Sequence, residues 1–180
     1  INALIIEPSV HLAKICRDKG LEVSEKFLED INDSDLPISK KCFVSFELFE
    51  HLHDPLIFMQ SLEKVMLKGD LFIFTTLSGI GVDIQVLKEH SKSVSPPHHL
   101  NFFNPKSVCK LINDVGLEVL KAETPGKLDI DILKNNINKT GNPFWNSFLN
   151  YATEVEMQNM QDYLSSNNLS SHMMITCEKR

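Results

Sequence analysis

The sequence predicts an α/β fold built on a doubly wound, mostly parallel sheet. Apolar runs rich in β-branched and aromatic residues, at 1–6, 42–49 and 71–76, are typical of buried strands. Amphipathic helical patterns separate these runs, and strands that alternate with helices favour parallel pairing. Sheets of this kind bind ligands beyond the carboxyl ends of their strands, so we expect the site there.

The first half of the chain supplies three expected strands and two helices. A strand at 1–6 leads into a helix that stops at Gly20, a residue suited to the position after a helix. A short strand near 21–27, an acidic loop and the strand at 42–49 follow. Asp54 and Pro55 predict the next helix start, as N-cap and first helical residue.

The second half repeats the pattern and adds a helical segment. The strand at 71–76 runs into a loop rich in Ser, Pro and His, and Asn104-Pro105 predicts another helix start. A strand follows near 117–124. Residues 127–168 are expected to be mostly helical, and a last strand closes the chain. The expected apolar anchors of the helical segment are Phe144, Trp145, Phe148, Leu149 and Tyr151.

Composition narrows the class of protein. The 180 residues are 42% hydrophobic and 23% charged, which are globular values, and they suffice for one domain with a real core. The net charge of −6 does not indicate binding to nucleic acid or to an anionic membrane. No apolar run is long enough to form a transmembrane helix. Four scattered cysteines predict reduced thiols and a cytoplasmic location.

Titratable side chains gather where two of the expected strands end. Glu47, Glu50 and His51 lie at the carboxyl end of the strand at 42–49. Glu7 follows the first strand, where doubly wound folds place a carboxylate that accepts both hydroxyls of a ribose. A solvated loop acid is the other interpretation of Glu7 alone.

The order of four short motifs carries a family resemblance. ALIIEPS, FLEDI, FELFEHLHDP and LKGD follow one another between residues 3 and 70. This series resembles the class I S-adenosylmethionine-dependent methyltransferases, particularly their small-molecule branch, from residue 1 to about 125. The resemblance implies a Rossmann-like methyltransferase fold, S-adenosyl-L-methionine as cofactor, and methyl transfer as the activity.

The same resemblance implies which residues contact the cofactor. Glu7 would hold the ribose hydroxyls, with Pro8 and Ser9 shaping the turn beneath the adenosine. Leu28 and Glu29 would lie beside the adenine. The residues expected near the sulfonium are Phe46, Glu47 and Leu48.

The chain departs from the family pattern at two places. LKGD lacks the proline and second glycine usual in that turn, a change expected to affect the turn and not the chemistry. The family's first strand and its glycine-rich loop are absent, and the chain starts with Ile1 inside an apparent strand. We therefore expect an N-terminally truncated domain, with a gap between the strands that start at Ala3 and Phe43.

Three histidines are the candidate catalytic residues. His51 lies at the end of one strand, and His98 and His99 lie in the loop after the next. An imidazole has a pKa suited to removing a proton from an acceptor hydroxyl, and a plain turn role is the alternative. His53 is expected to support its turn. These histidines could hold zinc by residue type, but no cysteine lies nearby, so no metal is expected.

We expect a single methyltransferase-like domain over 1–180. Its parts are a cofactor-side core at 1–125, a mostly helical insertion at 126–170 and a final strand at 171–180. The ending SSHMMITCEK faintly resembles a subgroup acting on sugars or nucleotide sugars, so a small-molecule acceptor of that kind is expected. A homodimer is compatible with the insertion. The alternatives are a non-catalytic interaction module that has lost cofactor binding, and a nicotinamide-dependent enzyme.

Overall fold

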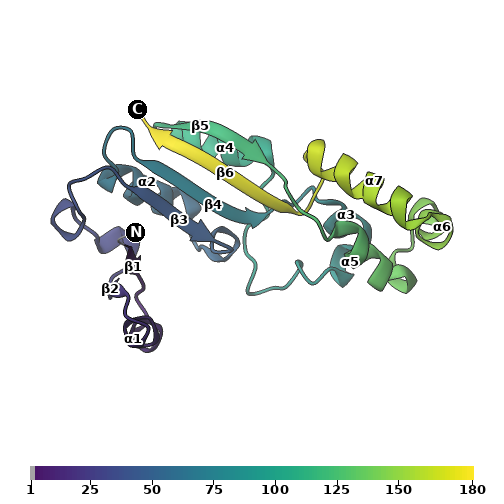
Figure 1. Cartoon of the computed structure of the whole chain (residues 1–180), viewed down its shortest axis with the longest axis horizontal. Helices are drawn as coiled ribbons and strands as arrows, with labels where there is room; N and C mark the ends of the chain where they lie inside the picture. Colours follow the sequence, from purple (N-terminus) through teal and green to yellow (C-terminus); the bar gives the residue numbers. More distant parts are fainter. Residues whose placement is uncertain (1–2) are drawn as a thin grey trace.

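The strands form two sheets in this computed structural model, which describes residues 3–180 (Figure 1). A small parallel sheet pairs β1 (Leu4–Ile6) with β2 (Glu22–Ser24). The larger sheet has the order β3-β4-β6-β5. Its strands are β3 (Cys42–Phe46), β4 (Leu71–Leu77), β5 (Leu117–Glu123) and β6 (His172–Lys179). β3 and β4 are parallel, and β6 is antiparallel to both of its neighbours.

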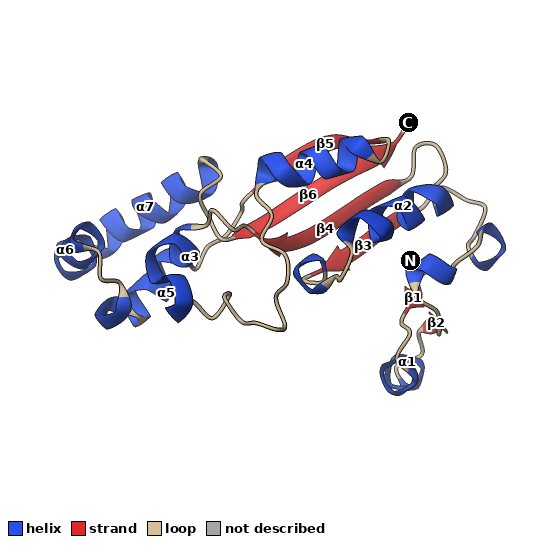
Figure 2. Cartoon of the chain, turned by 180° about the vertical axis from the view of Figure 1, so that it is seen from behind, coloured by secondary structure: helices blue, strands red, loops and turns tan. Residues whose placement is uncertain are grey.

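The helices divide between one face of the large sheet and one end of the molecule. The helices are α1 (Val10–Asp18), α2 (Pro55–Val65), α3 (Val82–Leu87), α4 (Pro105–Asp114), α5 (Asp129–Asn135), α6 (Pro143–Tyr151) and α7 (Glu154–Ser166). Figure 2 shows α2 and α4 on the same face of the sheet, with α3, α5, α6 and α7 gathered beyond its end. None of the helices within residues 3–180 has the length and apolar character needed to cross a membrane.

Two separate apolar clusters stabilise these groups. The first lies between the large sheet and helices α2 and α4, and its largest buried members are Phe49, Phe72, Phe74, Met59, Leu62, Ile112, Met173 and Ile175. The second holds the four end helices together, through Leu87, Ile130, Leu133, Leu149, Met157 and Leu164. The end helices therefore have a core of their own, separate from that of the large sheet.

Side-chain caps start the helices where the sequence predicts. Asp54 accepts hydrogen bonds from the backbone N–H of Leu56 and Ile57 at 3.0 Å each, and Pro55 is the first helical residue. Asn104 caps α4 in the same way. Gly20 has a φ of +79° just after α1, a conformation that favours glycine. These local signals confirm the predicted helix ends.

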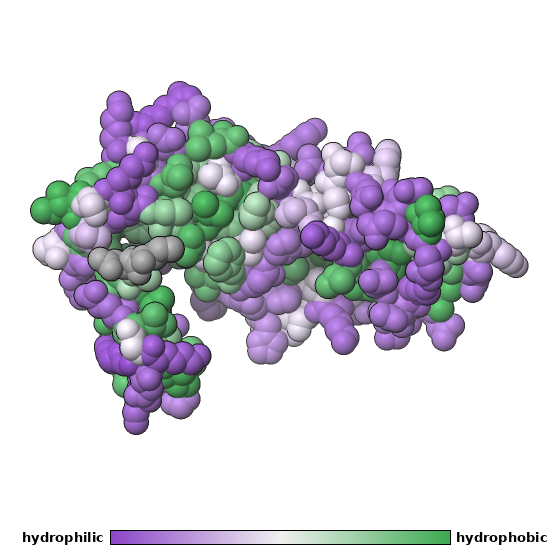
Figure 3. Space-filling view, viewed as in Figure 1, coloured by the Kyte–Doolittle hydropathy of each residue, from purple (hydrophilic) through white to green (hydrophobic). Residues whose placement is uncertain are grey.

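Three expectations about burial and secondary structure are wrong. The strand at 42–49 is not buried, because α2 and α4 cover only one face of the sheet. Val44 is 59% exposed and Phe46 65% exposed. Figure 3 shows apolar side chains on the surface of the sheet face that these helices leave uncovered. Phe144 and Tyr151 are exposed, not anchors of the helical segment. Helix α3 lies in what was expected to be loop, since its N-cap Gly81 offers no side-chain signal.

The turn LKGD fixes the starts of β3 and β4. Asp70 is buried, and its two carboxylate oxygens accept hydrogen bonds from the backbone N–H of Lys41 at 2.7 Å and of Leu67 at 2.8 Å. The Lys41 ammonium lies 3.0 Å from the same carboxylate. Gly69 has a φ of +84°, which a residue with a side chain rarely adopts. Asp70 therefore stabilises the turn in place of the proline and glycine of the family pattern.

The β1–β2 unit is set apart from the large sheet. β1 and β3, expected on either side of an absent strand, belong to different sheets. Figure 1 shows β1, β2 and α1 extending away from the four-stranded sheet. Only Ala13 is buried in α1.

Candidate functional site

A tight turn after β3 brings two glutamates to the end of β4. Glu47 has a φ of +51°, a strained conformation for a residue other than glycine, and such strain is common at functional sites. Its N–H donates to the carbonyl of Thr75 at 3.1 Å. The hydroxyl of Thr75 donates to Glu47 at 2.7 Å, and the hydroxyl of Thr76 donates to Glu50 at 2.8 Å. Two consecutive threonines therefore orient the two carboxylates.

The turn after Glu47 is anchored by an aromatic ring. Residues Phe49–His51 form a 3-10 turn in which Phe49 and Glu50 are buried. The Phe49 ring lies 4.8 Å from that of Phe74 and 5.5 Å from that of Phe103, measured between centroids. Because Phe49 is held in the first core, the neighbouring Glu50 and His51 have a fixed backbone position.

The loop that carries His98 and His99, called the histidine loop below, is held against this turn by hydrogen bonds to backbone carbonyls. The N–H groups of Leu100 and Asn101 both donate to the carbonyl of Glu50, at 2.7 and 3.1 Å. The Asn101 side-chain amide donates to the carbonyls of Phe49 and Leu52 at 3.3 and 2.6 Å. These bonds join segments that are far apart in the sequence, and they place the loop over the turn.

Two of the three predicted catalytic histidines, His51 and His99, meet where the loop contacts the turn, and we call this contact the histidine junction. The rings of His51 and His99 lie 4.8 Å apart between centroids, nearly edge to face. His51 Nδ1 lies 2.8 Å from the carbonyl oxygen of His98, and His99 Nδ1 lies 2.7 Å from that of Ser93. His98 therefore contributes its backbone to the junction, and its ring makes no hydrogen bond within residues 3–180.

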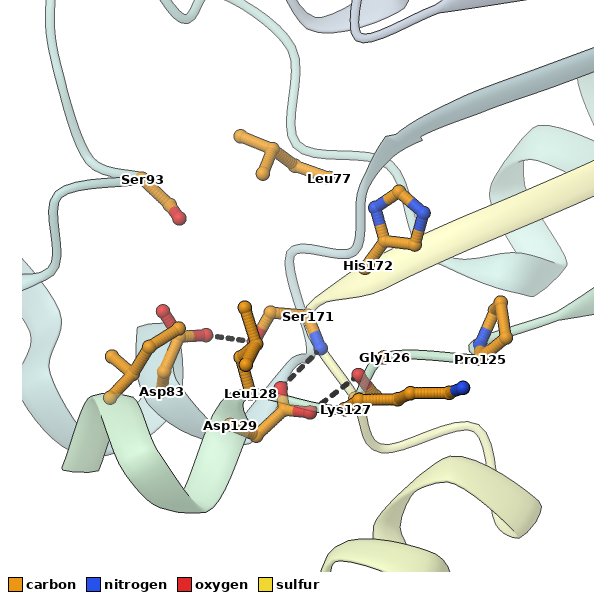
Figure 4. A pocket seen from close by; sticks show the side chains of 12 residues that line it. Leu77, Asp83, Ser93, Pro125, Gly126, Lys127, Leu128, Asp129, Ser171 and His172 are labelled. Atoms are coloured by element: carbon orange, nitrogen blue, oxygen red, sulfur yellow. Dashed lines mark hydrogen bonds between the residues drawn. The ribbon is translucent and has the colours of Figure 1, made fainter. Parts of the chain in front are cut away.

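A cavity of about 320 Å³ opens between the end of β4 and the end helices (Figure 4). His172 at the start of β6 lines it, and His172 Nδ1 lies 3.3 Å from a carboxylate oxygen of Glu47. Lys127 and Ser93 also line it. A β-carbon at Gly126 would lie 1.8 Å from the Ser170 hydroxyl, so only glycine fits there. This cavity could not be predicted from the sequence because its walls come from segments that are distant in the sequence.

Two buried aspartates support the floor of this cavity. Asp129 accepts hydrogen bonds from Ser170 Oγ at 2.6 Å and from the Ser171 N–H at 2.8 Å. The Ser171 hydroxyl donates to Asp83, and Ser91 Oγ donates to the same carboxylate at 3.1 Å. Burial raises the pKa of Asp83, and the neighbouring charge of Asp129 adds to that rise. The network connects α3 and α5 to the start of β6.

The predicted cofactor residues fall into two groups. Glu7 and Ser9 lie on the β1–β2 unit, where a carboxylate oxygen of Glu7 accepts the Ser9 N–H at 2.8 Å; Pro8 between them is exposed. The partly buried Leu28 packs against the first core, and Glu29 is exposed.

Phe46, Glu47 and Leu48 form the second group, at the end of β3. No hydrogen bond joins this group to the first within residues 3–180. The structure therefore brings together the acceptor-side candidates. Glu7 directly follows β1, which Figure 1 shows apart from the large sheet.

The fold and the site define a Rossmann-like α/β domain whose acidic and imidazole side chains lie at the carboxyl ends of β3 and β4. The sequence matches the family described as "Methyltransferase domain" over residues 5–122, which is more than half of the chain. The chain belongs to this family. The predicted family, enzyme class and Rossmann-like α/β fold are thereby confirmed.

Solved structures share this fold at low sequence identity. A SAM-dependent methyltransferase from Thermotoga maritima superposes with a TM-score of 0.59 at 13% identity, covering 98% of this chain and 72% of that one. One from Archaeoglobus fulgidus gives 0.60 at 13%, covering 98% and 75%. The mycolic acid cyclopropane synthase CmaA1, solved with SAH, gives 0.59 at 13%, covering 99% and 70%. No curated protein matches the sequence significantly.

Proposed function

We propose that this chain transfers a methyl group from S-adenosyl-L-methionine to a small-molecule acceptor. The cofactor supplies an electrophilic methyl group on a sulfonium sulfur. Membership of the methyltransferase-domain family supports the reaction, and the similar structures described as SAM-dependent or containing SAH support the cofactor. The observation that carries the proposal is the cavity lined by His172, whose ring contacts Glu47, at the strand ends where α/β folds bind ligands.

The residues of the cofactor side have the chemistry that this molecule needs. One oxygen of Glu7 is used by the Ser9 N–H, which leaves the other for ribose hydroxyls. Phe46 and Leu48 are exposed apolar side chains at the end of β3, suited to the uncharged parts of the molecule. Pro8, Ser9, Leu28 and Glu29 complete the proposed set, with the roles that the family resemblance implies.

The acceptor side combines the cavity with the histidine junction. The cavity has a volume of about 320 Å³, at the small end of the range for ligand pockets, which suits a small acceptor. Ser93, Lys127 and His172 offer hydrogen-bonding groups to hydroxyls, so a sugar or nucleotide sugar is the first acceptor class to test. We assign His51 and His99 to the acceptor, where Nε2 of each ring can take its proton, with His98 holding His51.

The remaining expectations stay part of the proposal. The net charge of −6 supports a small-molecule partner in preference to a nucleic acid. A cytoplasmic location and a homodimer are predictions from the sequence, and analytical ultracentrifugation tests the second. The domain division at 125 and 170 is likewise proposed.

Calorimetric titration with S-adenosylhomocysteine tests the cofactor assignment. Glu7→Ala should weaken binding by about 1.5–3 kcal/mol, the contribution of hydrogen bonds to a charged group. Glu22→Ala, on the adjacent strand β2, is the matched control and should bind like the unaltered protein. Equal affinity of Glu7→Ala and the control would remove Glu7 from the site.

The same titration decides between the enzyme and a non-catalytic module. Exposed Val44 and Phe46 and the separate β1–β2 unit are the features that favour a module without cofactor binding. Absence of heat and of a thermal shift at millimolar ligand would favour that module and contradict the proposed activity. Binding followed by methylation of a sugar substrate, detected by mass spectrometry, would support the enzyme.

A further inference from the structure

Three side chains at the histidine junction have the types and the spacing of a metal-binding set. One carboxylate oxygen of Glu50 and one ring nitrogen each of His51 and His99 lie within 4.8 Å of one another. Tetrahedral coordination at bonds of about 2.1 Å needs ligand atoms about 3.4 Å apart. Small adjustments of the three side chains, with the backbone unchanged, can close that difference.

Both histidines are hydrogen-bonded in the manner of metal ligands. Nδ1 of His51 faces the carbonyl oxygen of His98, and Nδ1 of His99 faces that of Ser93. A carbonyl oxygen only accepts, so Nδ1 carries the proton in each neutral ring and Nε2 keeps its lone pair. Metal-bound histidines almost always donate their second ring N–H to such a group, which fixes the tautomer and the ring orientation.

The Glu50 carboxylate lacks a compensating charge. Glu50 is 2% exposed, and its side chain accepts one hydrogen bond, from the Thr76 hydroxyl to Oε2. No lysine, arginine or histidine forms an ion pair with it in the part of the chain that the structure describes. A buried carboxylate is costly unless it is paired or coordinates a metal, and a cation beside Oε1 would supply the missing charge.

The backbone around the three side chains is fixed in advance. The bonds from Leu100 and Asn101 to the Glu50 carbonyl hold the histidine loop against the turn. Asn101 adds two side-chain bonds to the same turn. Binding of an ion then requires only side-chain rotation, which keeps the entropic cost of organising the ligands small.

We propose that Glu50, His51 and His99 bind a divalent transition-metal cation of the zinc class. Two imidazoles and one carboxylate suit zinc, cobalt, iron or manganese, whereas magnesium and calcium prefer oxygen ligands. Three protein ligands leave a coordination position open, as in catalytic sites and unlike closed structural ones. No metal was expected from the sequence because no cysteine lies near these histidines, and the position of buried Glu50 beside them depends on tertiary contacts.

The consequence for the reaction rests on the proposed function, whereas ion binding does not. The open position can hold the acceptor hydroxyl, whose pKa a bound cation lowers. His51 and His99 would then act as ligands and not as bases. The acceptor proton leaves to solvent from an oxygen that is already polarised.

Titration with Co²⁺, followed by its visible absorption, tests the site directly. The unaltered protein should bind one Co²⁺ with the intense spectrum of four- or five-coordinate cobalt, and Zn²⁺ should displace it. Glu50→Gln and His99→Ala should weaken Zn²⁺ binding by at least about tenfold, since even indirect partners of metal ligands contribute about 10–100-fold. His53→Ala removes an exposed imidazole close to His51 in the sequence and is the matched control.

Several results would overturn the proposal. They are a cobalt spectrum no stronger than that of the hydrated ion, equal zinc affinity in His99→Ala and His53→Ala, or displacement of cobalt by equimolar Mg²⁺. Circular dichroism shows whether each variant is folded. If His99→Ala does not fold, Glu50→Gln still tests the site, because it keeps the shape of the side chain. Titration with S-adenosylhomocysteine in a chelator separates the two proposals, because the cofactor residues do not include these three.

Discussion

Asp70 and Glu50 are buried carboxylates at opposite ends of β4, and their surroundings differ sharply. Asp70, just before the strand, accepts the N–H groups of Lys41 and Leu67 and lies 3.0 Å from the Lys41 ammonium. Glu50, held by Thr76 near the end of the strand, accepts a single hydroxyl. The protein gives the first carboxylate two N–H donors and an ammonium, and it gives the second one hydroxyl donor.

The difference separates a structural role from a functional one. Burial would raise the pKa of Asp70, but the hydrogen bonds from Leu67 and Lys41 outweigh it, so the pKa is lowered overall. The fold therefore stabilises the ionised form of Asp70. Glu50 has one hydroxyl donor, and it lies where two histidines meet, a set of side-chain types that can bind a cation.

The largest effect on stability is expected at Asp70. Asp70→Asn leaves one backbone N–H without an acceptor and removes the carboxylate charge paired with the Lys41 ammonium, which keeps only the carbonyls of Pro37 and Ser39. It should lower the free energy of unfolding by about 2–4 kcal/mol. Asp114→Asn, which breaks an exposed pair with Lys110, is the control and should cost under about 0.5 kcal/mol. Urea unfolding at neutral pH measures both. Equal midpoints would show that Asp70 does not fix the turn.

The pH dependence of the same variant gives an independent check. Because the pKa of folded Asp70 is below its ordinary value of 3.8, its ionisation contributes stability above pH 3.8. That contribution is lost as the pH falls through the folded pKa. The gap between the unaltered protein and Asp70→Asn should therefore narrow in acid. A gap that stays constant with pH would show that the ionised carboxylate is not what stabilises the turn.

Local signals made much of the fold predictable. Asp54-Pro55 and Asn104-Pro105 place helix starts through hydrogen bonds between near neighbours in the sequence, and the apolar run at 71–76 predicts the central strand β4. The exposure of Phe46 could not be predicted, because it depends on whether a helix covers that face of the sheet.

The site was predictable in place but not in detail. Parallel strand ends predicted that His51 and the histidine loop would lie close together. The position of the strand ends does not show whether the His98 or the His99 ring contacts His51. Adjacent loop residues point in different directions, and tertiary contacts decide which ring faces His51. The roles of Thr76 and Asn101 depend on contacts between distant parts of the sequence, as the Thr76–Glu50 and Asn101–Phe49 bonds show.

A smaller effect of opposite direction is expected at Glu50. In a chelating buffer, Glu50→Gln should leave the free energy of unfolding unchanged or raise it by up to about 1 kcal/mol, because a neutral amide replaces a weakly compensated buried charge. The amide oxygen can still accept from Thr76. Thermal unfolding with added Zn²⁺ should stabilise the unaltered protein and not the variant. A loss of several kcal/mol without metal would make Glu50 structural, like Asp70.

The smallest effect is expected at Asp83, a third buried carboxylate, whose hydrogen bonds offset the effect of burial on its pKa only in part. Burial is the main cause of its raised pKa, which the hydrogen bond from Ser91 only partly offsets. As the pH rises from 3.8 through the folded pKa, the unfolded chain loses this proton before the folded one, so stability falls. Asp83→Asn has no carboxyl group to lose this proton, so its stability should not fall in this way. The free energy of unfolding of the variant, measured by urea titration, should therefore rise relative to that of the unaltered protein across this pH window. A difference that shrinks with pH would mean that the Ser91 and Ser171 hydroxyls outweigh burial, which would group Asp83 with Asp70.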